Sequence, residues 1–138
     1  MRRYLLDTGI VGDFLDDRHG IPAKVKSAII AGNSVGIGTP VLAEIVYGFE
    51  NSSTRDRNMR RLVAGLRLLR VWPFEQPMAY EYGRLAAELR RRGRPMQQID
   101  MMIAAIAFTL GNCTVVSKDS DLLAVPNLAV ENWAEPAA

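Results

Sequence analysis

The stretch Arg3-Tyr4-Leu5-Leu6-Asp7-Thr8-Gly9 near the start of the chain decides the fold. Its short apolar run ends abruptly in a carboxylate and a turn, which is typical of a buried strand. In a parallel sheet, the carboxyl ends of the strands open onto the crevice where such sheets bind ligands. We therefore expect Asp7 to place a negative charge in a ligand-binding crevice.

Strand-like and helix-like segments alternate along the rest of the chain. We expect strands at 3–7, 34–38, 68–72, 113–116 and 127–130. We expect helices at 10–15, 22–30, 40–49, 59–66, 78–92 and 99–110, with Thr39 as the N-cap of the third, and a Pro-containing tail. The polar segment 51–58 is either a loop or the frayed start of a helix. This alternation predicts an α/β fold in which helices cover both faces of a parallel sheet. The length fits a single domain over residues 1–138.

Composition excludes several classes of protein. With 49% hydrophobic and 23% charged residues, the chain is typical of globular rather than disordered proteins. The longest apolar run, Met101 to Leu110, is shorter than the ~18 residues that a membrane span needs. The start of the chain lacks the apolar region of a signal peptide, and the single cysteine, Cys113, allows no internal disulfide. We expect a cytoplasmic protein with no membrane partner.

The formal charge of +2 does not by itself indicate a nucleic-acid partner. Only Lys24, Lys26 and Lys118 are lysines among the 17 cationic residues, and the rest are arginines. Arginine forms bidentate contacts with phosphate, so this bias favours RNA or phosphate binding. A GC-rich genome explains the same bias equally well.

Three further carboxylates, Glu44, Asp100 and Asp119, occur at positions comparable to that of Asp7. A buried carboxylate is costly unless it is paired or binds a metal. Oxygen ligands of this kind suit Mg²⁺ or Mn²⁺, and one Cys and one His supply no competing cluster. The pattern favours a divalent metal site that hydrolyses phosphodiesters.

Each acid also has a simpler explanation. Asp7 could cap the following helix, Glu44 could be solvated, Asp100 could offset a helix dipole and Asp119 could form an Asx-turn. The four acids nevertheless all fall at strand ends or first helical turns. That shared placement favours one common site.

Five stretches in order resemble the PIN domain, and more closely the VapC-type toxins of bacterial toxin–antitoxin pairs. They are Tyr4-Leu5-Leu6-Asp7-Thr8, the segment 39–48, Gly93-Arg94-Pro95 followed by Asp100, the segment 103–107, and Ser117-Lys118-Asp119-Ser120-Asp121-Leu122. The resemblance covers most of the chain. It implies a PIN-like three-layer α/β/α sandwich with a central parallel sheet.

The resemblance also implies a Mg²⁺- or Mn²⁺-dependent endoribonuclease that arrests translation. Asp7, Glu44, Asp100 and Asp119 would be the metal-binding and catalytic acids, with a metal-activated water giving a 5′-phosphate and a 3′-hydroxyl. Thr8 and Ser117 would support the site, and Asp121 would be an outer carboxylate or, as we favour, a helix cap. The implied partners are RNA, a VapB-type antitoxin and a second copy in a homodimer.

Several residues outside the acids carry weaker expectations. Gly9 and Gly12 depart from the family, which commonly has small polar residues there, so support around the acids is reduced. An acidic cleft needs flanking cations to admit RNA, and Arg84 is our candidate. The apolar residues Val46, Tyr47 and Phe49 would either bind the antitoxin or belong to the core. We expect Trp72 and Trp133 in the core. We expect His19 on a surface loop.

Three rival functions stay open at this point. One is a PIN nuclease with a processing or DNA-directed role, and another is a catalytically silent, DNA-regulating binding module of the same fold. A third is a phosphoacceptor resembling response regulators, which would need a lysine near the place of Lys118. The helical positions of Glu44 and Asp100 do not fit that third class.

Overall fold

A computed structural model of the chain describes residues 1–134. Its centre is a five-stranded sheet whose strands are all parallel and lie in the order β3-β2-β1-β4-β5. The strands are β1 (Arg3–Leu6), β2 (Ser34–Gly38), β3 (Arg70–Trp72), β4 (Cys113–Val116) and β5 (Val130–Glu131). The expected parallel sheet is confirmed.

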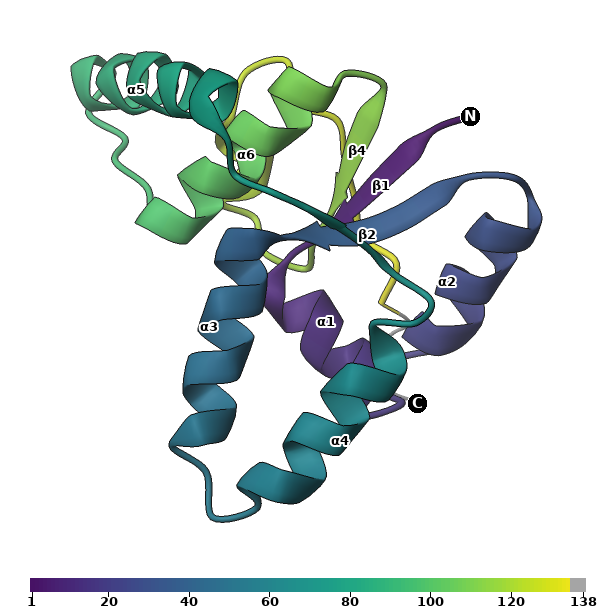
Figure 1. The fold of residues 1–138 in the computed structure, drawn as a ribbon. Coiled ribbons are helices and arrows are strands. Elements are labelled where there is room, and N and C mark those ends of the chain that lie inside the picture. The colour runs from purple at the N-terminus through teal and green to yellow at the C-terminus, as the bar shows by residue number, and fades with distance from the viewer. Residues whose placement is uncertain (135–138) are drawn as a thin grey trace.

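Six helices cover this sheet on both sides, as Figure 1 shows. They are α1 (Thr8–Leu15), α2 (Ile21–Ile30), α3 (Thr39–Glu50), α4 (Arg55–Gly65), α5 (Gln76–Arg91) and α6 (Gln98–Leu110), followed by the short 3-10 helix η1 (Leu122–Ala124). Helices α1, α2 and α4 pack together on one side, and α5 packs on α6 at the other. Helix α3 starts at the end of β2 and contacts α1, α4 and α6. The three-layer α/β/α arrangement is therefore confirmed.

The strand order creates a switch point beside β1. The chain runs outward from β1 to β2 and β3, then returns to β4 on the opposite side of β1. Ligands bind in open α/β sheets at such a reversal, outside the carboxyl ends of the strands. Because Leu6 pairs with Val116, the residues that follow β1 and β4 emerge side by side at this point.

The hydrophobic core lies on both faces of the sheet. Leu5 and Leu6 of β1 and Val115 and Val116 of β4 are fully buried. Helix α6 buries every residue from Ile103 to Ala107, as its continuous apolar sequence predicts. Trp72 and Trp133 are both 9% exposed, so their assignment to the core is confirmed.

Some element boundaries differ from those expected. Helix α4 begins at Arg55, so the second half of the segment 51–58 is the start of a helix and not a loop, and the helix buries only Leu62. Its first four residues, 55–58, are all polar, so no apolar residue marks the start of this helix in the sequence. Strand β3 starts at Arg70 rather than at residue 68, and β5 is Val130–Glu131 rather than 127–130.

The N-cap of α3 is Gly38, so the assignment of Thr39 as the cap is wrong. The Thr39 hydroxyl instead accepts a hydrogen bond from the Phe74 amide at 3.0 Å, which ties α3 to the segment after β3. The Pro-containing tail at 135–138 lies outside the described residues. Within residues 1–134, no helix is long and apolar enough to cross a bilayer.

Candidate active site

Asp7 stands at the junction of β1 and α1. Its amide donates to the Val116 carbonyl at 3.1 Å, which continues the β1–β4 pairing one residue past β1. One carboxylate oxygen, Oδ1, caps α1 by accepting from the Ile10 amide at 2.9 Å, so the capping role is confirmed. The other, Oδ2, accepts from the Ser117 hydroxyl. Burial raises the pKa of Asp7 although both hydrogen bonds act in the opposite direction.

The loop after β4 brings further acids to the same place. The Ser117 hydroxyl accepts from the Asp119 amide at 2.8 Å, and Asp119 Oδ1 accepts from the Asp121 amide at 2.9 Å. The second bond is an Asx-turn, so that explanation of Asp119 is also confirmed. These bonds fold the loop back so that it lies beside Asp7.

A hollow of about 330 Å³ lies at the carboxyl ends of β1 and β4. It is lined by Asp7, Thr8, Gly9, Glu44, Gln97, Ile99, Asp100, Lys118 and Asp119. All four acids singled out in the sequence thus border one space. Glu44 reaches it from α3 and Asp100 from the first turn of α6, so four separate parts of the chain build it.

Three of the carboxylates approach one another closely. Oxygen atoms of Asp100, Asp119 and Asp121 all lie within 4.8 Å of each other. Partial burial, followed by the charges of Asp119, Asp7, Asp121 and Glu44, raises the pKa of Asp100 to about 6. Asp121 occupies the N-cap position of η1, as we favour, but its side chain makes no cap hydrogen bond and its carboxylate lies in this cluster.

The donors at this hollow fit a hard divalent cation. They are carboxylate oxygens, which Mg²⁺ and Mn²⁺ prefer, whereas neither His19 nor Cys113 lines the hollow. The Thr8 hydroxyl oxygen is buried and finds no hydrogen-bond partner within residues 1–134. Mutual repulsion of the carboxylates is the penalty that a bound divalent cation would remove.

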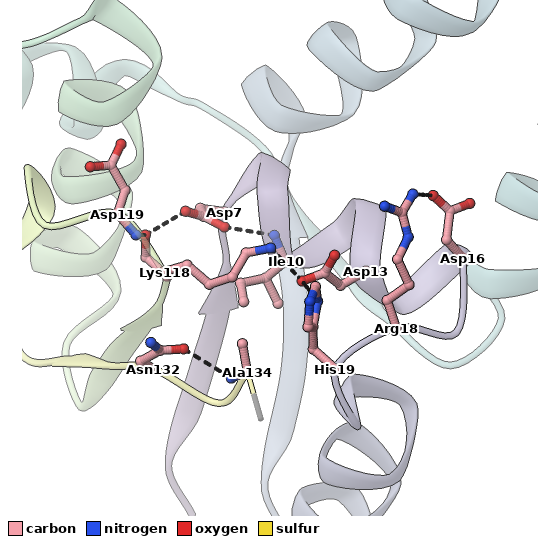
Figure 2. A network of polar contacts seen from close by, with 11 residues as sticks. Asp7, Ile10, Asp13, Asp16, Arg18, His19, Lys118, Asp119, Asn132 and Ala134 are labelled. Carbon is pink, nitrogen blue, oxygen red and sulfur yellow. Dashed lines mark hydrogen bonds and ion pairs between the residues drawn. The ribbon is translucent and has the colours of Figure 1, made fainter. Parts of the chain in front are cut away.

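Sequence reasoning missed Asp13, which is 4% exposed on α1. Figure 2 shows the Lys118 side chain reaching across to Asp13, where its ammonium nitrogen lies 2.6 Å from Oδ2. His19 lies on an exposed turn, as expected, and its Nδ1 lies 3.0 Å from the same oxygen. Burial opposes ionisation of Asp13, yet the hydrogen bonds from Lys118 and His19 hold its pKa below the ordinary value. The available signal was an acid close to the apolar residues Val11 and Phe14 in one expected helix.

Other expected contacts are not formed at the hollow. Arg84 does not line it, and its guanidinium lies 2.8 Å from Glu81 and 3.5 Å from Glu88 along α5. Val46 and Phe49 pack against the core, whereas Tyr47 is 70% exposed. Tyr47 borders a separate apolar groove with Phe74 and Met102, next to Glu44.

The fold and the acidic crevice together define a PIN domain. The family model described as "PIN domain" matches residues 4–128, and the chain belongs to this family. The resemblance drawn from the sequence is therefore confirmed. It extends to the VapC branch, as three curated relatives indicate.

Ribonuclease VapC2 of Rickettsia felis is 28% identical over 94% of this chain and 97% of the relative. The tRNA(fMet)-specific endonuclease VapC of Shigella flexneri is 28% identical over 97% of this chain and 100% of the relative. That of Salmonella typhimurium is 30% identical over 70% of this chain and 74% of the relative. The chain is thus similar to VapC nucleases over their length.

Solved structures agree with this assignment. The VapBC2 complex of Rickettsia felis, bound to a DNA fragment from the promoter, contains a chain that superposes with a TM-score of 0.88 at 28% identity. The match covers 95% of this chain and 98% of that one. DNA-bound VapBC from Salmonella typhimurium gives a TM-score of 0.88 at 25% identity, covering 97% of this chain and 100% of that one.

Proposed function

We propose that this chain is the toxin of a type II toxin–antitoxin pair and acts as a Mg²⁺- or Mn²⁺-dependent endoribonuclease. The observation that carries the proposal is the convergence of Asp7, Glu44, Asp100 and Asp119 on one hollow at the switch point of the sheet. The similarity to VapC nucleases over nearly the whole chain supports it.

The residues around the hollow have different proposed roles. Asp7, Glu44, Asp100 and Asp119 are the proposed ligands of the cation, and Asp121 joins them because its oxygen lies within 4.8 Å of those of Asp100 and Asp119. Asp7 is oriented by Ser117 and the Ile10 amide, and Glu44 faces the same space from α3. When bound, a divalent cation lowers the pKa of a coordinated water and offsets the negative charge of the scissile phosphate. The Thr8 hydroxyl is available as a further oxygen at the edge of the hollow.

The partners follow from the same proposal. The substrate is RNA, and tRNA is the first class to examine because two similar nucleases carry tRNA(fMet) in their names. A VapB-type antitoxin is the protein partner, since the similar solved chains come from VapBC complexes. We also propose a homodimer, and a cytoplasmic location where such a toxin meets RNA. Arg84 remains a candidate RNA contact only if its pairs with Glu81 and Glu88 open.

The test is cleavage of total bacterial RNA, tRNA included, by the purified chain. We expect discrete fragments with Mn²⁺, none with EDTA, and a loss of at least about 100-fold in Asp7→Asn, because Asn keeps the helix cap but removes the charge. Asp56→Asn is the matched control, since Asp56 is an exposed acid on α4 away from the hollow.

Two outcomes would contradict the proposal. Cleavage that persists in Asp7→Asn would rule out the carboxylate site as the origin of the activity. Absence of any Mn²⁺-dependent fragment from total RNA would rule out the ribonuclease itself. The silent, DNA-regulating module would then be the better explanation.

A further inference from the structure

An acidic hollow repels a nucleic-acid substrate, because both are negatively charged. Asp7, Glu44, Asp100 and Asp119 line it, and each phosphate that enters brings another negative charge. A bound divalent cation offsets part of this repulsion, but neighbouring phosphates also need a positive group. Among the described residues lining the hollow, Lys118 is the one cation.

The position of Lys118 is fixed from two directions. Its backbone lies between Ser117 and Asp119, whose hydrogen bonds shape the loop after β4. Its ammonium group is anchored 2.6 Å from Oδ2 of the buried Asp13. Figure 2 shows the stretched side chain between these two points, with the Asp119 carboxylate turned away from the ammonium.

Two features allow the ammonium to bind an anion while it stays paired with Asp13. An ammonium has three donors, and the bond to Asp13 uses one of them. The Lys118 side chain is 38% exposed, whereas that of Asp13 is 6% exposed, so the open side of the pair is the lysine side. Asp13 therefore fixes the position of the Lys118 ammonium group. Because Asp13 itself is buried, its carboxylate does not face a substrate that approaches from solvent.

Gly9 lies beside both the Lys118 stem and the Asp7 carboxylate. A Cβ at Gly9 would lie 3.9 Å from Lys118 Cε and 3.8 Å from Asp7 Oδ1. Both distances are ordinary van der Waals contacts. The family commonly has a small polar side chain at this position, whereas in this chain the stem of Lys118 lies next to Gly9.

We propose that Lys118, held by Asp13, binds a phosphate of the RNA next to the acidic cluster and so positions the strand for cleavage. This inference rests on the proposed ribonuclease function and adds a substrate-binding residue to it. Asp13 is a positioning residue, because it acts through Lys118 and does not line the hollow. His19 completes the anchor at 3.0 Å.

The test measures RNA binding separately from cleavage. Anisotropy of a fluorescein-labelled, mixed-sequence single-stranded RNA is followed in EDTA at several salt concentrations. We expect Lys118→Gln to weaken binding about 10-fold at low salt and to reduce the slope of log affinity against log salt by about 0.7, the value for one phosphate contact. Lys118→Arg should keep most of the affinity, and Lys24→Gln, an exposed lysine on α2, is the matched control.

A second variant guards against misfolding. Lys118→Gln alone leaves Asp13 buried without its cation, whereas Asp13→Asn combined with Lys118→Gln replaces the ion pair with two amides. We expect the double variant to show the same loss of affinity and the same reduced slope. In Mn²⁺, both variants should raise KM for RNA more than they lower kcat.

Two results would overturn the inference. One is an unchanged salt slope in both variants, which would leave Lys118 as a structural partner of Asp13 alone. The other is RNA binding by the unmodified chain that does not depend on salt. Neither result depends on the cleavage assay, so failure of the ribonuclease function would be recognised separately by the absence of Mn²⁺-dependent fragments.

Discussion

The Ser117 hydroxyl donates a hydrogen bond to Asp7 Oδ2 across 110 positions of sequence. The same hydroxyl accepts from the Asp119 amide at 2.8 Å. Ser117 is 2% exposed, so neither bond competes with bulk water. One small side chain therefore joins the end of β1 to the acidic loop after β4.

Ser117→Ala should destabilise the chain by about 1–3 kcal/mol, because it leaves a buried carboxylate oxygen and a backbone amide without their partner. Ser117→Thr retains the hydroxyl and is the control. Urea unfolding in EDTA measures both free energies. Equal stability of the Ala and Thr variants would show that the hydroxyl does not hold the two strands' ends together.

Removing metal should give an unusual pH dependence of stability. The pKa of Asp100 is raised to about 6 and that of Asp7 is also raised, so folding disfavours their charged forms. The metal-free chain is therefore less stable above pH 6, and its stability should rise by on the order of 1 kcal/mol as the pH falls from 7.5 to 5, allowing for solvent screening.

Below pH 5 the stability should instead decrease as the pH falls. Asp13 and Asp16 have lowered pKa values, and they lose their ion pairs when they are protonated. Thermal melts in EDTA follow the effect, and Asp100→Asn should flatten the curve between pH 7.5 and 5. A melting temperature of the unmodified chain that falls steadily over that interval would contradict the assignment.

Asp121 should contribute to metal affinity. Its carboxylate lies with those of Asp100 and Asp119, so Asp121→Asn should weaken Mn²⁺ binding by about 10- to 100-fold. Titration calorimetry at pH 7.5 measures this, with Asp56→Asn as the matched exposed acid. If Asp121→Asn binds Mn²⁺ as tightly as Asp56→Asn does, Asp121 is not part of the site.

Gly36 should be intolerant of any side chain. A Cβ there would lie 2.2 Å from the Arg70 carbonyl oxygen on the neighbouring strand β3, a backbone atom that cannot move without opening the sheet. Gly36→Ala should therefore destabilise the chain by about 3 kcal/mol or more, comparable to other severe core changes.

Gly12 in α1 is the control for Gly36, because nothing lies within 4 Å of a Cβ built there. Gly12→Ala should leave stability unchanged or raise it by up to about 1 kcal/mol, because alanine favours the helix. Equal melting temperatures for the two alanine variants would show that β2 and β3 are not packed so closely.

The sequence alone determined the alternating α/β order and the four acids. Both depend on local patterns, namely apolar runs that end in turns and carboxylates at the ends of those runs. Helix α6 was predictable because it is apolar on every side, and the Cys113–Val116 strand because its run is short and bounded by turns. Helix α4 was also expected, but its start was placed at residue 59 instead of Arg55 because residues 55–58 are all polar.

Only the tertiary structure decided how these parts meet. The strand order places β4 beside β1, and that pairing brings Ser117 to Asp7. The turn after β4 gives Asp121 its place in the cluster, and the Asp13–Lys118 pair joins residues 105 positions apart. No local spacing encodes such contacts, because they arise when strands distant in sequence become neighbours in the sheet.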